Sequence, residues 1–276
     1  MPNKTYTNVY VSNKSANSYF FELWKYRELF YFFLWRDFIV RYKQTILGIT
    51  WSVIRPLVVM LIFTVVFSFI AKLPSKDIPY PLLVLSALIP WQFFSNSLSE
   101  AGNSVINNSN LVSKIYFPRL ILPLSTISVC LVDFIIAFLI LLFFMAWYGV
   151  TPDWRIVFLP FIIILTLLLS IGVGVWMAAL SAKYKDFQYV IPFIIQISLY
   201  ASPVGYSIEI IPENLRFVFS LNPLVGIIDG YRWVLLGSNY EFYATGFLIS
   251  VVISFAIFLY GIFYFRRVEN KIVDIV

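Results

Sequence analysis

The sequence predicts an all-α integral membrane protein with six transmembrane helices, on three observations. The 276 residues are 61% hydrophobic and 12% charged, with a mean hydropathy of +0.85, a composition that soluble domains do not have. The apolar residues form long runs, several of which reach the roughly 20 residues that cross a bilayer as a helix. Basic residues gather in the polar segments that would lie on one side of the membrane.

Several kinds of site are excluded by residues that are absent or rare. The chain has no His, which excludes His-based metal sites and His-based acid–base catalysis. Cys130 is its single cysteine, so no intrachain disulfide can form. The sequence has no G-x-x-x-x-G-K-[ST] motif, which excludes ATP hydrolysis by a P-loop in this chain. Its polar start lacks an apolar core and is unlike a cleaved signal peptide.

The first 30 residues are predicted to form an N-terminal cytoplasmic segment, and residues 31–276 a single transmembrane domain. This domain should begin with an amphipathic helix in the plane of the membrane interface. One predicted face is aromatic and apolar: Tyr31, Trp35, Phe38, Ile39, Tyr42 and Ile46. The opposite face is polar and mostly basic: Arg36, Asp37, Arg41, Lys43 and Gln44. Gly48 then allows a change of direction before the first span.

Six apolar runs are the predicted spans: residues 49–71, 82–98, 120–147, 156–180, 187–200 and 242–265. Arg55 interrupts the first run and should reach the headgroups or line a wet cleft. Pro90 should kink the short second span, and Gly172 and Gly174 should let the fourth approach a neighbour closely. Residues 202–241 are too apolar for a soluble loop and too rich in Pro and Gly for a span. They should form re-entrant or interfacial helices.

The distribution of Lys and Arg predicts the orientation. Fifteen lie in the N-terminal part up to Arg55, in the polar breaks 99–119 and 181–186, and in the tail. Five lie on the other side: Lys72, Lys76, Arg155, Arg216 and Arg232. Both termini are therefore expected to be cytoplasmic, which requires an even number of spans.

Asp133 is the clearest ionisable residue deep within a predicted span. A charge at this depth is costly and is usually functional or paired. Proton coupling is one interpretation. The other is that Asp133 lies near a wet cleft or pairs with a neighbouring span, and the lack of His or Lys relay partners favours it.

Three stretches carry a family resemblance. The first contains Arg-Asp, Arg-Tyr-Lys, Leu-Gly-x-x-Trp and Pro-Leu within residues 36–57. The second follows the second span: Asn110, Leu111, Lys114, Phe117, Pro118, Arg119, Leu122 and Pro123. The third precedes the last span: Asn222, Pro223, Leu224, Gly226, Tyr231 and Arg232. Together they resemble the membrane subunits, or permeases, of ABC transporters that export polysaccharides, including O-antigen, capsule and teichoic-acid exporters.

The resemblance implies a homodimer with two copies of a separate ABC ATPase subunit, which would bind ATP and Mg. This chain is then a transport subunit of the bacterial inner membrane, not an enzyme, with no cofactor of its own. A coupling helix at about residues 100–110 should dock on the ATPase. The expected coupling residues are Glu100, Asn103, Ser104, Asn107, Lys183 and Asp186. The implied cargo is a lipid-linked, O-antigen-like polysaccharide, with no nucleic-acid partner.

The cargo suggests two further sets of residues. Guanidinium groups grip diphosphates, so the basic face of the interface helix is the candidate for recognising the lipid diphosphate: Arg36, Arg41 and Lys43. Sugar rings stack on aromatic faces, although aromatic residues also form interface belts. The candidates for a sugar path are Trp91, Phe94, Trp176, Tyr200, Tyr206, Tyr231 and Trp233, and residues 202–241 would form an extracytoplasmic gate.

Two alternative functions stay open. A drug or lipid exporter of the same superfamily would differ only in its cargo. An integral-membrane glycosyl- or acyltransferase would need clustered acids, His or a metal site at an interface. Glu209, Glu213 and Asp229 are the extracytoplasmic acids that could form such a cluster.

Overall fold

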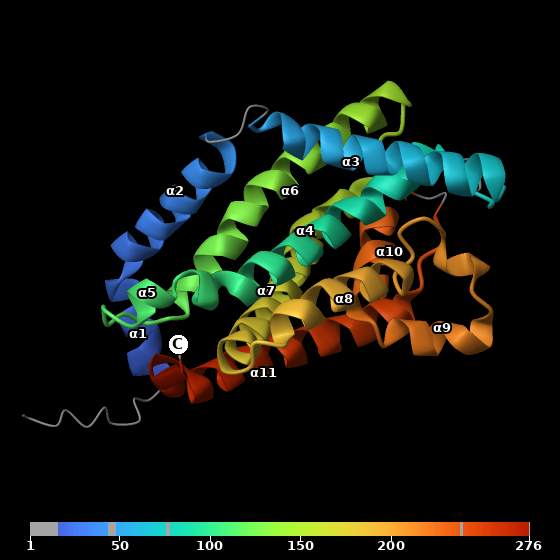
Figure 1. Ribbon diagram of the computed structural model, residues 1–276. Helices are drawn as coiled ribbons and strands as arrows, with labels where there is room; N and C mark the ends of the chain where they lie inside the picture. Colours follow the sequence, from blue (N-terminus) through green and yellow to red (C-terminus); the bar gives the residue numbers. More distant parts are fainter. Residues whose placement is uncertain (1–15, 44–47, 76–77, 238–239, 276) are drawn as a thin grey trace, which may run out of the picture.

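The computed structural model describes residues 16–43, 48–75, 78–237 and 240–275. Within these ranges every regular element is a helix (Figure 1), which confirms the all-α membrane class. Among the described residues, five helices are long and apolar enough to cross a membrane. They are α3 (Thr50–Phe63) with η1 (Thr64–Ile70), α4 (Tyr80–Asn107), α6 (Ile121–Trp147), η2 (Trp154–Phe158) with α7 (Leu159–Lys183), and α11 (Ala244–Ile275).

The predicted span at residues 187–200, the fifth along the chain, is present only as a short helix. α8 (Phe187–Tyr200) has 14 residues, or about 21 Å of helix, whereas the hydrocarbon core of a bilayer is about 30 Å thick. Pro192 lies inside α8 and Pro203 follows it, so the helix is not extended to full length. The five long helices and this shorter one account for the six apolar runs.

The segment predicted to be re-entrant contains two short helices and one buried helix. η3 (Ile208–Ile210) and α9 (Glu213–Ser220) lie at the end of the bundle opposite to the C-terminus (Figure 1). α10 (Pro223–Leu235) then returns into the bundle and packs against α11, α4 and α7. Its start is set by Asn222, whose side chain accepts from the Leu224 N–H, and by Pro223 in the first turn.

α4 is the most enclosed of the long helices. Its most apolar window is 78% buried, against 11–33% for the other four. The prediction that this span is short and ends near Leu98 is wrong, because α4 continues for nine residues to Asn107. Its polar side chains bond back to carbonyls of the same helix: Asn103 to Ser99 and Ser104 to Ala101. These bonds satisfy the side chains without breaking the helix.

Small residues allow α7 to lie close to its neighbours, as predicted. A Cβ on Gly172 would stand 2.6 Å from Phe258 Cα, and a Cβ on Gly174 would stand 3.1 Å from Ala101 Cβ. Gly172 therefore sets the contact with α11 and Gly174 the contact with α4. Gly48 has a φ of 46°, which confirms the predicted change of direction before α3.

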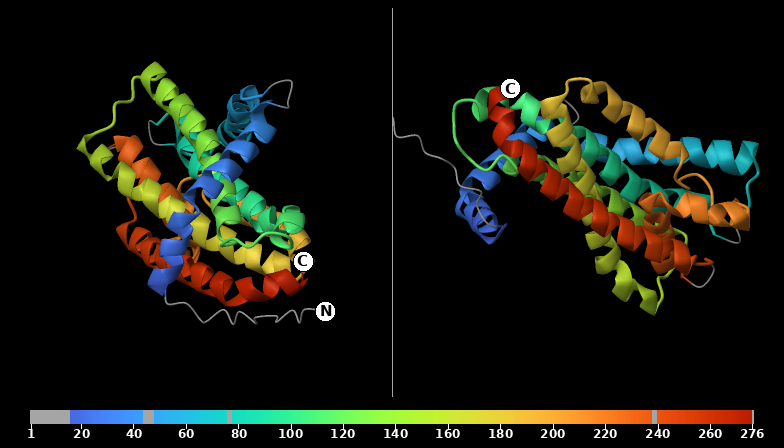
Figure 2. Two further views of the ribbon diagram at one scale, coloured as in Figure 1. Left: turned by 90° about the vertical axis from the view of Figure 1, so that its left-hand side faces the viewer. Right: turned by 90° about the horizontal axis from the view of Figure 1, so that it is seen from below.

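One end of the bundle brings together α1 (Ala16–Lys25), α2 (Arg27–Lys43), α5 (Ser109–Val112) and the end of α11 (Figures 1 and 2). Glu269 on α11 connects α1 and the segment after α5, because it accepts from Tyr19 Oη at 2.8 Å and from the Arg119 N–H at 2.7 Å. Burial and the adjacent Glu269 raise the pKa of Tyr19, so its phenol stays protonated as a donor. Both described ends of the chain thus lie at the same end of the bundle.

Candidate functional site

The face of α2 that packs on the bundle carries both apolar and charged residues. Phe33, Asp37 and Arg41 follow one another at four-residue spacing, so they share a helix face. Phe33 is 3% exposed and packs on the ring of Phe117. The outward side of α2 carries aromatic residues that are at least half exposed: Tyr31, Phe32 and Trp35. Figure 2 (left) shows α2 crossing α6, against which it packs.

This placement corrects the predicted environment of the basic face. The sequence predicts that Arg41 faces the aqueous side of an interface helix. The structure instead places Arg41 between acids on α4 and α6, because helix packing brings those acids together. The predicted residues Gln44 and Ile46 lie outside the described residues.

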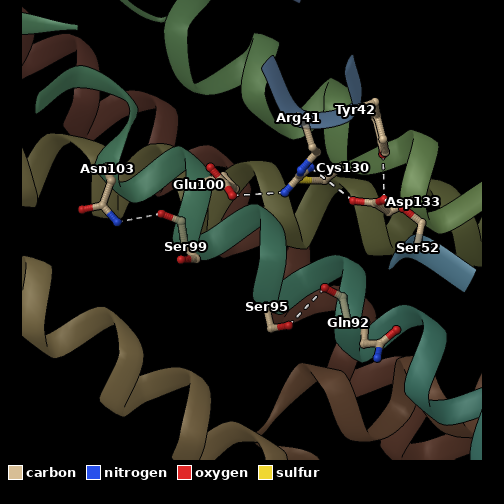
Figure 3. A network of polar contacts seen from close by, with 10 residues as sticks. All are labelled: Arg41, Tyr42, Ser52, Gln92, Ser95, Ser99, Glu100, Asn103, Cys130 and Asp133. Carbon is tan, nitrogen blue, oxygen red and sulfur yellow. Dashed lines mark hydrogen bonds and ion pairs between the residues drawn. The ribbon is translucent and has the colours of Figure 1, made fainter. Parts of the chain in front are cut away.

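A cluster of polar contacts centres on Arg41 (Figure 3). Its Nη2 lies 3.1 Å from Glu100 Oε1, and its Nη1 lies 3.2 Å from Asp133 Oδ2. The same Nη1 lies 3.6 Å from the sulfur of Cys130. Arg41 therefore connects α2 to both α4 and α6.

Asp133 is paired, as one of the two interpretations of the sequence predicts. Besides the ion pair with Arg41, it accepts hydrogen bonds from Tyr42 Oη at 2.7 Å and Ser52 Oγ at 2.5 Å. Burial, and then the hydrogen bond to Asp133, raises the pKa of Tyr42, so its phenol remains a donor. The partners come from α2 and the start of α3.

A cavity of about 790 Å³ lies between α3, α4 and α6, with the end of α2 at one side. Asp133 and Arg55 line it. Both positions agree with the predictions that Asp133 lies near a wet cleft and that Arg55 lines one. α4 contributes a row of polar residues at helical spacing: Gln92, Asn96, Ser99 and Glu100. Trp51 and Phe93 add aromatic surface.

A second cavity of about 500 Å³ lies between α2 and the end of α4. Its polar lining includes Arg36, Asp37, Asn107 and the same Arg41–Glu100 pair that lines the larger cavity. Arg36 forms an ion pair with Asp37 at 2.7 Å and lies over the ring of Phe33. The Arg41–Glu100 pair therefore stands between the two cavities.

The structure brings two predicted sets of residues into one place. Glu100, Ser104 and Asn107, predicted for ATPase coupling, line the second cavity together with Arg36 and Arg41, predicted for diphosphate recognition. Lys43 is exposed nearby at the end of α2.

The remaining coupling candidates lie elsewhere, and no separate helix covers residues 100–110. Residues 100–107 are the last turns of α4, and α5 has only four residues. Asn103 bonds to the Ser99 carbonyl and lines neither cavity. Lys183 and Asp186 are exposed at the turn between α7 and α8.

The predicted sugar-path residues do not converge on either cavity. Phe94 and Tyr231 are buried in the core, and Tyr200 is 73% exposed. The others make separate contacts: Trp91 with Ser198, Trp176 with Tyr260, Tyr206 with Arg232, and Trp233 with Phe242. All of these residues are aromatic, but the structure places them in different parts of the bundle.

Arg232 has a structural role that its place in a motif and among the basic residues of the other side did not predict. It is completely buried and donates to the carbonyls of Leu83, Val204 and Tyr206. An arginine and an aspartate, Arg232 and Asp229, within a mostly apolar helix were the available signal. Nearby, Asp229 accepts from Tyr240.

The three suspected extracytoplasmic acids do not form a metal site. In the described ranges no group of three or more His, Cys, Asp or Glu residues is placed to hold a metal ion. Asp229 is buried within α10, whereas Glu213 is exposed on α9.

The Arg41–Asp133 ion pair should show measurable coupling in a double-mutant cycle. Arg41→Gln and Asp133→Asn should each lower the free energy of unfolding by about 2 kcal/mol, and the double variant should lose about 1 kcal/mol less than their sum. The more local Arg36–Asp37 pair is the control and should couple by less than about 0.5 kcal/mol. Denaturant unfolding of the purified chain measures both cycles. If the losses caused by Arg41→Gln and Asp133→Asn simply added, the two residues would not form a stabilising ion pair.

Residues 28–236 match the family described as ABC-2 type transporter, a range that contains every residue lining the two cavities. The chain is 28% identical over 247 residues to the O-antigen export system permease protein RfbA of Klebsiella pneumoniae, covering 87% of this chain and 92% of that protein. Identity to the protein of the same name from Myxococcus xanthus is 27% over 214 residues, covering 76% and 81%. Identity to the polysialic acid transport protein KpsM of Escherichia coli is 24% over 234 residues, covering 81% and 89%.

Proposed function

This chain belongs to the ABC-2 type transporter family, and we propose on that premise that it is the membrane subunit of an ATP-driven polysaccharide exporter. The cargo is a lipid-linked, O-antigen-like polysaccharide, and the membrane is the bacterial inner membrane. One observation carries the proposal. Relatives named for O-antigen export and polysialic acid transport align with 76–87% of this chain.

The proposed exporter contains two copies of this chain and two copies of a separate ATPase subunit. The absence of a P-loop motif in the 276 residues supports a separate ATPase. The end of the bundle that contains α5 and the turn between α7 and α8 is the proposed ATPase-facing end. Its exposed polar residues include Asn107, Lys183 and Asp186.

The same end is proposed to face the cytoplasm. Both described ends of the chain lie there (Figure 1), and basic residues are concentrated in its segments. They are Lys25, Arg27, Arg36, Arg41, Lys43, Lys114, Arg119, Lys183, Lys185, Arg266 and Arg267. The positive-inside rule supports a cytoplasmic position for this end.

Deleting this chain from its own bacterium should stop polysaccharide export, with lipid-linked glycan accumulating on the cytoplasmic face of the inner membrane. Restoring the chain should restore surface glycan. Glycan is measured by lectin or antibody labelling of intact and of permeabilised cells, with the empty vector as control. Normal surface glycan without the chain would contradict the polysaccharide cargo and would favour a drug or lipid cargo.

A further inference from the structure

We propose that the 790 Å³ cavity binds the sugar unit nearest to the lipid carrier, and that the Arg41–Glu100 ion pair is a gate between this cavity and the second one. The inference rests on the proposed function, because it locates part of that function's substrate. It assigns the sugar to a position between α3, α4 and α6. The aromatic residues predicted to form a sugar path lie elsewhere.

The lining of the cavity matches a neutral ligand that is rich in hydroxyl groups. Gln92, Asn96 and Ser99 offer both donors and acceptors on one face of α4. Trp51, which is 54% exposed, offers a flat apolar surface of the kind on which the C–H faces of sugar rings pack. The volume lies within the range of roughly 300–1,000 Å³ that is usual for small-molecule sites.

The charges of the cavity argue against placing the diphosphate there. Arg41 and Arg55 contribute two positive charges, and Glu100 and Asp133 contribute two negative ones, so the formal charges cancel. A diphosphate in this cavity would lie close to two carboxylates, which repel it. A sugar is neutral and can bond to carboxylates and guanidinium groups alike.

The Arg41–Glu100 pair has the features expected of a gate between the two cavities. Both residues line both cavities, and the Glu100 side chain is 50% exposed. An exposed ion pair contributes little to stability, so Glu100 can leave at small cost. Arg41 would remain held by Asp133 and by its contact with Cys130.

A polar route continues on both sides of this pair. Asn96, Ser99 and Glu100 line the larger cavity, and Glu100 and Asn107 line the second (Figure 3 shows Ser99 and Glu100 on α4). Positions 96, 100 and 107 repeat at four and seven residues, which places them on one face of α4. The polar part of a lipid-linked substrate that moved along this face would pass the Arg41–Glu100 pair.

Thiol labelling tests the gate. Val59→Cys, combined with Cys130→Ser, places one thiol in the larger cavity on the α3 side, away from the polar row. A membrane-impermeant maleimide is added in inside-out vesicles containing the complete transporter. Glu100→Gln should raise the labelling rate about fivefold, because it removes the ion pair.

Glu28→Gln is the matched control, since Glu28 is an exposed acid on α2 that lines neither cavity and receives the same chemical change. It should leave the labelling rate unchanged. An unchanged rate with Glu100→Gln, or an equal rise with Glu28→Gln, would overturn the gate. Co-purification with the ATPase and a single elution peak show that each variant is folded.

Protection of the same thiol tests the ligand. Three probes are compared on the complete transporter in nanodiscs: a short prenyl diphosphate carrying one N-acetylhexosamine, the same prenyl diphosphate without the sugar, and inorganic diphosphate. The sugar-bearing probe alone should slow labelling. Equal protection by the sugar-free probe would show that lipid or diphosphate fills the cavity, and no protection by any probe would show that the cavity is not a binding site.

The same experiment separates the two proposals when export is measured in parallel. If the parent chain exports glycan but no probe protects the thiol, the sugar site is wrong and the proposed function stands. If the sugar-bearing probe protects the thiol but deletion of the chain leaves export intact, the proposed function is wrong and the cavity remains a sugar site.

Discussion

Replacing Arg232 with Met should lower the midpoint of thermal unfolding of the purified chain by about 10 °C. Arg232 is 0% exposed, and its guanidinium donates to three backbone carbonyls, at Leu83, Val204 and Tyr206. Met fills a similar volume but leaves these buried acceptors without their donor, which costs roughly 3–5 kcal/mol. Each kcal/mol corresponds to a shift of about 2–4 °C in a protein of this size.

The same contacts explain why the effect should extend from α10 to the segment that follows α8. Leu83 lies on α4, whereas Val204 and Tyr206 lie on the segment that follows α8. Arg232 therefore holds α10, α4 and this segment together. Loss of the side chain should also increase proteolysis within residues 201–212, measured by limited digestion and mass spectrometry.

Arg216→Met is the matched control. Arg216 also donates to backbone carbonyls, at Ile211 and Glu209, but it lies on α9 and is partly exposed. Water can replace its hydrogen bonds, so the change should cost about 1 kcal/mol or less. Equal shifts for the two variants would show that burial of Arg232 does not determine its importance.

Gly172→Ala should prevent the normal packing of α7 on α11 and should reduce the yield of folded protein severely. The added Cβ would stand 2.6 Å from Phe258 Cα and 2.7 Å from Phe258 N. Backbone atoms cannot rotate away, so the two helices must separate, and the contacts along both are lost. The loss should outweigh the gain of about 0.5–1 kcal/mol that Ala normally brings to a helix.

Gly102→Ala provides the control with the same chemical change. Gly102 also lies in a helix interior, and the nearest atom to its Cβ would be Ile191 Cδ1. That atom is the end of a flexible side chain, which can adopt another rotamer. Size-exclusion chromatography and thermal unfolding should show Gly102→Ala close to the parent chain. Similar behaviour of the two Ala variants would refute the backbone-contact argument.

The sequence by itself determined the class of the protein and the position of its apolar helices. Hydropathy and helical periodicity depend on residues that are neighbours along the chain, so the apolar runs located the helices. Six spans were predicted, and the described residues contain five long helices and the shorter α8. Local chemistry also predicted the turn at Gly48 and the close approach at Gly172. The motif residues led to the transporter family that the comparisons show.

The end of α4 shows where local reasoning failed. The apolar run ends at Leu98, so the sequence predicted that the span ends there and that a separate helix covers about residues 100–110. In the structure Ala101, Ser104 and Val105 are buried, and that packing keeps the helix intact to Asn107. Tertiary contacts thus outweighed the local preference.

The candidate site was decided by the tertiary structure alone. Arg41 meets Glu100 across 59 positions, and Tyr42 meets Asp133 across 91. No local pattern relates such distant residues, because their meeting depends on how α2, α4 and α6 pack. Each residue type was recognisable in the sequence as a candidate for function or pairing. Only the packed helices determined that Arg41 is held by carboxylates and that two cavities meet at its side chain.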